Sequence, residues 1–554
     1  MRSHAPGSNG PGDEALTPEP DARVALDRAR RVSGSAQLTR IAGRYPDKTG
    51  FIYLDHSYSF AEVDARVNRV ASGLASIGVT KGERVAMLMG NSMATVEAYF
   101  ALSRLNAIAV PINLRFVAPE IEFILADSGT SALLVDQAHA ETAAQARMPV
   151  PGVGSCVVVG GDAQVGGPGS LAWDDVINAA DAHPPMPTVD NDDAATIMYT
   201  SGTTGRPKGA VLTHYSLAMS TLSAMIEQQL SESDEVWYLN LPLFHISGLA
   251  GIYPYMFVGG TSVIAPLGAF DAKTAVDDLE RYQVTAACFV GPQWQAIVAL
   301  PGVEDRRYAL RRVIWGTSPA IVPLLEAVRR AFPRAAIYNT FGQTEMSPVS
   351  CMLKAQDFDS HKGSVGKPVI NVEARIVDDA MRDVAPGEVG EIVYRGPNVM
   401  KEYWNLPEAT EEAFSGGWFH SGDLCRQDDE GFIYVVDRKK DVVISGGENI
   451  YSAEVEAVIV RHPKVRDVAV IGVPHPKWGE TPWAVVTCTD PSDPPTEEEL
   501  LEHCKNEMAS FKKPSSFIVL EGDLPRNAMG KVTKPVLRAQ YGGSLVEPAS
   551  RRTT

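Results

Sequence analysis

Cysteines are few in this sequence, and none lies close enough to another to suggest a pair or a cluster. The 554 residues include six, at Cys156, Cys288, Cys351, Cys425, Cys488 and Cys504. No C-x-x-C motif and no metal-type spacing with histidine occurs. These absences argue against a disulfide scaffold and a structural zinc site. They predict a protein of a reducing compartment, the cytoplasm.

Positive charge is also in deficit. The chain has 50 Lys and Arg residues against 68 Asp and Glu residues, a formal net charge of -18. Nucleic acid is therefore not expected as a partner, because binding it requires a basic surface that neutralises phosphates. A small anionic ligand is not excluded, since it needs only a local basic site. The hydrophobic content of 45% is ordinary for a globular protein with a large core.

The sequence shows no secretory signal and no uninterrupted apolar run of membrane length. Residues 1–34 lack an apolar segment of the signal-peptide kind, and we predict a disordered tail there. Residues 246–270 carry no charge, but Gly and Pro interrupt them repeatedly. They predict a buried helix followed by a strand at residues 261–264 rather than a membrane span, which leaves peripheral membrane contact open.

Apolar strands alternate with amphipathic helices through most of the chain, which predicts an α/β fold of layered sheets and helices. Residues 85–89 predict a strand, and residues 92–105 predict the helix after it. The charged stretch Val436–Asp441 precedes a compact region that we expect to form a small, mobile α+β domain. The predicted division is a tail (1–34), a large domain (35–436), a hinge (437–441), a small domain (442–541) and a flexible tail (542–554).

The small domain contains one clear helix start. Thr496 and Glu499 have the spacing of a capping box, in which each side chain hydrogen-bonds to the backbone N–H of the other residue. Helical periodicity then predicts one buried face. Its expected members are Leu500, Leu501, Cys504 and Met508.

The segment Tyr199–Gly209 combines hydroxyl, glycine and cationic residues in the strongest local motif. Glycines permit positive φ, so consecutive backbone N–H groups can converge on an anion, while Lys208 adds a charge. The segment joins an apolar strand at 194–198 to another at 209–212, whereas a Walker loop opens a helix and has a GxxxxGK[ST] spacing absent here. An ordinary solvated turn is the alternative. The expected phosphate-loop residues are Thr200, Ser201, Gly202, Thr203, Thr204, Gly205 and Lys208.

This loop and several later motifs resemble those of the adenylate-forming superfamily, which includes acyl-CoA synthetases, luciferases and peptide-synthetase adenylation domains. The resemblance extends over residues 38–541 and is strongest to bacterial fatty-acid–CoA ligases. The later motifs stand in the family's order: YNTFGQTE (338–345), GEVGE (387–391), GWFHSGD (417–423), DRKKD (437–441), SGGEN (445–449) and PRNAMGK (525–531).

The resemblance implies a reaction in two steps. A carboxylate attacks the α-phosphorus of ATP to give acyl-AMP and pyrophosphate, and the thiol of coenzyme A then displaces AMP. Lys531 resembles the lysine that bridges the carboxylate and the α-phosphate. Thr344 and Glu345 resemble the pair at the α-phosphate and Mg²⁺, for which glutamate supplies an oxygen ligand. Without the family, Lys531 would be a solvated charge and Glu345 a helix N-terminal charge.

The remaining nucleotide residues come from the same motifs. Asp423 resembles the aspartate that accepts both ribose hydroxyls, and Arg438 the arginine near the ribose and phosphates. Phe341 stands where many relatives have a tyrosine on adenine, so stacking is expected without the hydroxyl. Asn339 and Gly342 complete the expected ATP/AMP-binding set.

For the acyl group, the resemblance implies Trp315, Gly316 and Thr317, of which Thr317 is often Gly or Ala in relatives. We group His245 with the catalytic and acyl-binding residues as a gate or wall, not as a general base; a satisfied core histidine is the alternative. For coenzyme A, the resemblance implies a tunnel and a nucleotide clamp formed by Gly446, Gly447, Trp478, Phe511 and Lys513. Their alternatives are a turn, a core tryptophan and a surface pair.

Alignment with the hinge motif places the pivot of the small domain at Lys440. The leading hypothesis is an ATP- and Mg²⁺-dependent ligase that joins a medium- or long-chain fatty acid to coenzyme A. Alternatives are a ligase for a branched, sterol-derived or aromatic acid, and an enzyme that loads a carrier protein. A non-enzymatic nucleotide sensor conflicts with the intact Lys531, Glu345 and loop. Oligomeric state is undetermined from sequence.

Overall fold

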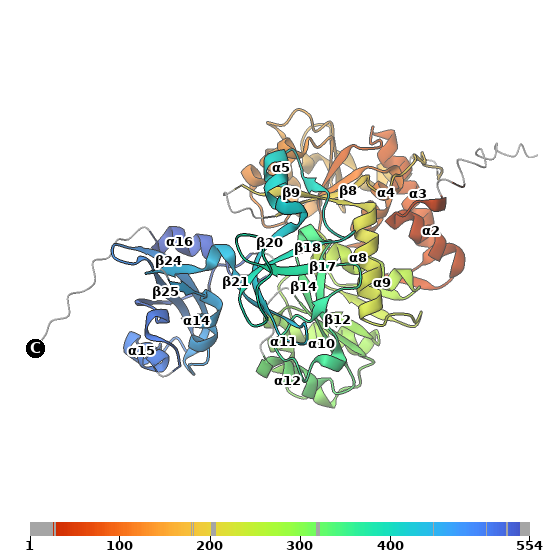
Figure 1. Ribbon diagram of the computed structural model, residues 1–554. Coiled ribbons are helices and arrows are strands. Elements are labelled where there is room, and N and C mark those ends of the chain that lie inside the picture. Colours follow the sequence, from red (N-terminus) through yellow and green to blue (C-terminus); the bar gives the residue numbers. More distant parts are fainter. Residues whose placement is uncertain are drawn as a thin grey trace, which may run out of the picture.

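A computed structural model of the chain has a large domain and a smaller C-terminal domain beside it (Figure 1). It describes residues 26, 29–178, 180, 182–200, 206–316, 322–446, 448–505, 507–527 and 530–542. The predicted tails therefore fall almost wholly outside the described residues, as do Ser201, Gly202, Thr203, Thr204, Gly205, Thr317 and Gly447.

Two sheets organise most of the large domain. The first has the order β16-β15-β14-β13-β12-β10-β11-β1-β2, and its strands from β14 to β1 run parallel. Its strands are β1 (Thr49–Tyr53), β2 (His56–Ser59), β10 (Val236–Leu239), β11 (Thr261–Ile264), β12 (Ala286–Cys288), β13 (Arg312–Trp315), β14 (Ala336–Gly342), β15 (Val349–Leu353) and β16 (Lys367–Pro368).

The second sheet has the order β19-β9-β8-β4-β3-β5-β6-β7. It places the predicted phosphate loop between two antiparallel strands, β8 and β9, as the sequence predicted. Its strands are β3 (Arg84–Leu88), β4 (Ile108–Pro111), β5 (Ala132–Asp136), β6 (Ser155–Val159), β7 (Leu171–Ala172), β8 (Ala194–Thr200), β9 (Lys208–Thr213) and β19 (Glu402–Tyr403).

Helices lie between the two sheets and on their outer faces (Figure 1). The inner layer joins both sheets in the main core cluster and consists of α2 (Gly34–Arg44), α3 (Phe60–Ser76), α4 (Met93–Leu105), α8 (His214–Glu227) and α9 (Ile246–Phe257). The outer face of the first sheet is covered by α10 (Ala272–Arg281), α11 (Gly291–Val298) and α12 (Val322–Ala331). The outer face of the second is covered by α5 (Ala118–Ser128) and α6 (Ala140–Arg147). Two shorter helices are α7 (Trp173–Asn178) and α13 (Pro407–Ala413).

A third sheet leads to the small domain. Its antiparallel strands are β17 (Glu373–Val377), β18 (Gly390–Arg395), β20 (Phe419–Gln427) and β21 (Ile433–Arg438). The small domain has a sheet of its own, with helices packed on it. These elements are β22 (Val443–Ser445), β23 (Glu448–Ile450), β24 (Val465–His475), β25 (Gly479–Cys488), β26 (Ser516–Leu520), α14 (Ser452–Ile459), α15 (Glu497–Lys505) and α16 (Lys534–Tyr541).

The architecture confirms the predicted α/β class with a large and a small domain. The exact domain limits stay a prediction. Within the predicted hinge, Asp437 and Arg438 are the last residues of β21, and Lys439–Asp441 form a short 3-10 turn before β22.

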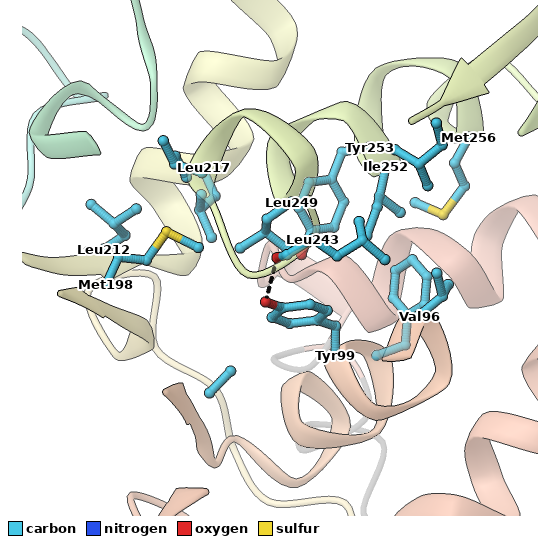
Figure 2. Close-up of a cluster of buried hydrophobic side chains, with 14 of the residues drawn as sticks. Val96, Tyr99, Met198, Leu212, Leu217, Leu243, Leu249, Ile252, Tyr253 and Met256 are labelled. Carbon is cyan, nitrogen blue, oxygen red and sulfur yellow. Dashed lines mark hydrogen bonds between the residues drawn. The ribbon is translucent and has the colours of Figure 1, made fainter. Parts of the chain in front are cut away.

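The uncharged stretch at residues 246–270 forms α9 and then β11, as predicted. Figure 2 shows Leu249, Ile252, Tyr253 and Met256 of α9 packed among side chains of α4 and α8, with the Tyr99 hydroxyl donating to the Leu243 carbonyl at 2.7 Å. Most of this apolar surface therefore serves the core. Among the described residues, no helix combines the length and apolar content that crossing a membrane requires.

The capping box of α15 is present. The Thr496 N–H donates to Glu499 Oε2 at 2.7 Å, and the Glu499 N–H donates to Thr496 Oγ1 at 3.2 Å. Leu500 and Cys504 are buried, as expected. The prediction was wrong for Leu501, which is 37% exposed, because it points about 100° away from Leu500 around the helix, towards solvent.

Candidate active site

The two ends of the phosphate loop lie beside the acidic residue of the YNTFGQTE motif. Thr200 ends β8 and Lys208 begins β9. The Thr200 hydroxyl donates to Glu345 Oε1 at 3.4 Å. The Lys208 Nζ lies 5.1 Å from the centre of the Tyr403 ring, whose hydroxyl donates to the same Glu345 oxygen at 3.0 Å. The structure thus joins motifs that are distant in sequence around one carboxylate.

Glu345 is held rigidly in the short turn Thr344–Met346 that follows β14. Its carbonyl accepts from the Met400 N–H at 2.7 Å, and its side chain is buried. The chain folds back tightly here: a Cβ atom on Gly342 would stand 1.9 Å from the Pro348 carbonyl oxygen. Gly342 is therefore required by a close backbone approach, whatever it contributes to a nucleotide.

Tyr403 was not among the residues expected from sequence. It lies in β19, which pairs with β9 so that Tyr403 stands opposite Ala210. Lys208 is two residues from Ala210 and shares its face, so strand pairing brings the aromatic ring to the loop lysine. Burial, with the nearby charge of Glu345 as a further cause, raises the pKa of Tyr403, so its hydroxyl acts as a hydrogen-bond donor.

Asp423 and Arg438 form a pair across neighbouring strands. They are register partners on β20 and β21, and Arg438 Nε lies 2.7 Å from Asp423 Oδ1. Asp423 is 2% exposed. Burial raises the pKa of its carboxyl, while Arg438 and Lys531 oppose the shift by favouring the charged form.

Lys531 comes to this site from the small domain. Its N–H donates to Asn527 Oδ1 at 3.0 Å, and the Asn527 carbonyl accepts from Arg115 of the large domain at 3.1 Å. The lysine residue is exposed, but protein atoms around it displace part of its hydration, which lowers its pKa. Nearby Arg438 lowers it further, while Asp423 raises it.

His245 lies within electrostatic range of the same lysine. Burial lowers its pKa to about 4, and the charge of Lys531 acts in the same direction. The ring Nδ1 accepts from the Ser247 N–H at 3.2 Å and lies 2.8 Å from the Ser247 hydroxyl. A backbone N–H can only donate, so in the neutral ring the proton belongs on Nε2. His245 can therefore offer an N–H to a bound group, but it is a poor base.

The residues expected near adenine and near the acyl group differ in how deeply they are buried. The Asn339 amide donates to the Ser364 carbonyl at 2.8 Å, and Phe341 is partly buried in β14. The Trp315 indole is fully buried in the core cluster beneath the first sheet. A Cβ atom on Gly316 would stand 2.6 Å from Thr340 Oγ1. The backbone here is tightly packed, and the indole of Trp315 packs in the core.

Residues expected to bind coenzyme A occupy two parts of the small domain. Gly446 and Trp478 are neighbours: the Gly446 N–H donates to the Trp478 carbonyl at 2.7 Å, and a Cβ atom on Gly446 would stand 2.9 Å from the indole. Phe511 lies in the turn Ser510–Lys512, and Lys513 follows it and donates to the Lys505 carbonyl at 3.4 Å. Trp478 and Phe511 are 45% and 44% exposed, as contact with a ligand would require.

Known proteins share this fold and resemble this sequence over most of its length. Residues 38–404 match the family described as AMP-binding enzyme, and residues 454–531 match the AMP-binding enzyme C-terminal domain. The chain is 38% identical to a feruloyl-CoA synthase of an Amycolatopsis species over 509 residues, 91% of this chain and 98% of that protein. It is 35% identical to an indoleacetate–CoA ligase of Aromatoleum aromaticum over 511 residues, 91% and 97% of the two chains.

Solved structures agree. The o-succinylbenzoate CoA synthetase of Bacillus subtilis, in complex with its acyl-adenylate intermediate OSB-AMP, superposes with a TM-score of 0.81 at 33% identity, covering 92% of this chain and 99% of that one. The same synthetase is known in complex with ATP and a magnesium ion, with a TM-score of 0.80 and 32% identity.

The environment of His245 predicts a pH response. Its folded pKa of about 4 lies below the unfolded value of about 6.5, so the unfolded chain binds the proton more readily. Stability from this residue is present above pH ~6.5 and is lost as the pH falls towards ~4. In an NMR titration of histidine-labelled protein, the His245 signal, assigned by its loss in His245→Asn, should stay neutral down to pH ~5. A midpoint at or above ~6.5 would contradict this environment.

Proposed function

The chain belongs to the AMP-binding enzyme family, and we propose that it is an acid–CoA ligase that activates an aromatic carboxylic acid as an acyl-adenylate. The observation that carries this proposal is that the turn carrying Lys531, bonded to Arg115 of the large domain through Asn527, places the lysine where its charge acts on Asp423 and His245. Such a site can cancel the charges of a carboxylate and a triphosphate as they approach each other.

In the first step, a carboxylate oxygen bonds to the α-phosphorus of ATP and the bond to pyrophosphate breaks. We assign Lys531 to the charge shared between the carboxylate and the α-phosphate. Asp423 keeps Oδ1 on Arg438 and offers Oδ2 to the ribose hydroxyls. Thr200, Lys208 and the backbone around Thr344 contact the phosphates.

Mg²⁺ fits the surroundings of Glu345. This hard cation prefers oxygen ligands and is commonly held by one or two carboxylates together with phosphates. Glu345 supplies such a carboxylate. Tyr403 and Thr200 both donate to its Oε1, and none of the described residues donates to its Oε2, which is available for the ion. When bound, the ion would neutralise phosphate charge and orient the phosphates.

In the second step, the sulfur of coenzyme A bonds to the acyl carbon, AMP leaves with the electron pair, and the thiol proton passes to solvent. We propose that the small domain turns about Lys440 between the steps, which removes Lys531 and brings Gly446 and Trp478 to the tunnel. The neutral His245 would line the acyl group and donate through Nε2.

The choice of an aromatic acid rests on the relatives. The sequence favoured a medium- or long-chain fatty acid and left an aromatic acid as an alternative. According to their names, the relatives described above act on ferulic, indoleacetic and o-succinylbenzoic acids. In addition, most of the apolar surface of α9 packs in the core. Both observations favour the aromatic alternative.

The decisive experiment incubates the protein with ATP, Mg²⁺ and coenzyme A and a panel of acids: ferulate, indoleacetate, o-succinylbenzoate, octanoate and palmitate. Pyrophosphate release and acyl-CoA by mass spectrometry are measured. We expect acyl-CoA from at least one aromatic acid, with higher kcat/KM than from either fatty acid. Preference for a fatty acid would contradict the aromatic assignment. Acyl-AMP without acyl-CoA would favour a carrier-protein acceptor, and no product at all would oppose the ligase assignment.

Replacing Lys531 should separate the two steps. Lys531→Ala should slow acyl-AMP formation by about 100-fold or more, the ~3 kcal/mol typical of a preorganised catalytic donor. Thioester formation from supplied acyl-AMP should change much less. Lys505→Ala, which removes an exposed lysine paired with Glu502 in the same domain, is the matched control. Equal loss in both steps would exclude the assigned role.

Tyr403→Phe tests the support of Glu345. The change removes one hydrogen bond to a buried carboxylate, worth ~1.5 kcal/mol when the acceptor is charged. Pyrophosphate release measured against Mg²⁺ concentration should need more Mg²⁺, with about a tenfold lower rate at subsaturating ion. The control is Tyr434→Phe, which removes a tyrosine–aspartate bond to Asp428. If both variants behave alike, Tyr403 does not act through Glu345.

A further inference from the structure

One contact joins the large domain to the small domain across the predicted pivot. Asp437 lies in β21, before Lys440, and its carboxylate reaches the start of α14, after Lys440. Asp437 Oδ2 accepts from the Ser452 hydroxyl at 2.8 Å and from the Ala453 N–H at 3.3 Å. Both side chains are buried, with Asp437 7% and Ser452 0% exposed.

The carboxylate of Asp437 is a suitable hydrogen-bond acceptor for the start of α14. The first N–H groups of a helix have no partner within the helix and carry a partial positive charge, so a carboxylate there is stabilised. Asp437 supplies that carboxylate from another strand, while its Oδ1 accepts from the Arg438 N–H at 2.7 Å. Burying the Asp437 carboxylate without these donors would destabilise the folded protein. The contact therefore stabilises the packing of the start of α14 against β21.

The contact extends into the small domain. The Ser452 hydroxyl that donates to Asp437 also accepts from Lys534 Nζ at 2.6 Å. Lys534, the first residue of α16, pairs with Glu456 of α14 at 2.7 Å. Asp437 therefore contacts a set of side chains, Ser452, Lys534 and Glu456, that are bonded to one another and link α14 to α16.

The residues on either side of Lys440 are anchored to different domains. Lys439 pairs with Asp379 at 2.9 Å and Glu391 at 3.3 Å, both in the large domain. Asp441 pairs with Arg538 of α16 at 2.8 Å. A rotation between the domains would therefore concentrate at Lys440 and would leave these two pairs intact. The contact of Asp437 with Ser452 and Ala453 crosses the rotating bond.

We propose that Asp437 is a positioning residue that latches the small domain in the orientation that delivers Lys531 to Asp423. Release of this latch allows the small domain to turn for thioester formation. The inference rests on the proposed two-step function, and it assigns to Asp437 an effect on domain orientation and none on the reacting atoms.

The first test compares the half-reactions of Asp437→Ala and Asp437→Asn with those of the parent protein. Loss of a charged acceptor should lower the rate of acyl-AMP formation relative to thioester formation from supplied acyl-AMP by about tenfold or more. Asp437→Asn, which keeps one acceptor oxygen, should show a smaller change. Asp493→Asn is the matched control, because its pair with Lys464 lies within the small domain and away from the pivot. Its ratio should equal that of the parent.

The second test does not require activity. The six native cysteines are all buried, so spin labels can be placed at Glu411→Cys on α13 and Glu498→Cys on α15, both exposed. Pulsed electron paramagnetic resonance then reports the distance between the domains. The parent should have a dominant population at the distance of this structure, and Asp437→Ala should shift a substantial part of it to other distances.

The outcomes separate this inference from the proposed function. Parent-like distances in Asp437→Ala, or equal slowing of both half-reactions, would overturn the latch even if the parent is an active ligase. A changed distance distribution and a changed ratio in Asp437→Ala but not in Asp493→Asn would support it. If the parent makes no product, the proposed function fails, and the distance measurement still decides whether Asp437 fixes the domain orientation.

Discussion

The ion pair between the buried carboxylate of Asp423 and the partly exposed Arg438 is the constraint around which the site is arranged. A carboxylate that is 2% exposed is unfavourable unless a cation and hydrogen bonds compensate for its lost hydration. Arg438 does so from the neighbouring strand at 2.7 Å. The pair joins register partners at the end of β21. Arg438, the last residue of β21, therefore connects the candidate nucleotide site to Lys440, the predicted pivot in the turn that follows.

Sequence patterns predicted the local features well. The strand–loop–strand at the phosphate loop, the helix and strand at residues 246–270 and the capping box of Thr496 depend on neighbouring residues, and the structure contains them. The contacts of Tyr403 and Asp437 depend on strand pairing and domain packing between distant segments. A tyrosine in a two-residue strand and an aspartate near the end of a strand, at the start of a charged stretch, have ordinary sequence surroundings, so no local pattern distinguishes them.

The acyl substrate was harder to predict than the nucleotide for a physical reason. Phosphates and ribose require particular donors and charges, which leave motifs. An apolar acid requires only a shape, and apolar residues near a motif serve packing as readily as binding. The Trp315 indole was expected beside the acyl group, yet it is buried in a core cluster, and the apolar side chains of α9 are likewise mostly used in the core. Apolar composition beside the motif therefore gave no information about chain length.

The order of residues along the chain matches the demands of two reactions at one site. Glu345, Asp423 and Arg438 precede Lys440, so a rotation there leaves the buried carboxylate of Asp423 with its arginine. Lys531 follows Lys440 and would leave with the small domain in the proposed rotation. Asp423 would then lose one of the two cations that oppose its protonation, and only the arginine would hold its charge. Because Arg438 would still favour the charged form of Asp423, Lys531 could leave the site without the carboxylate losing its only cation.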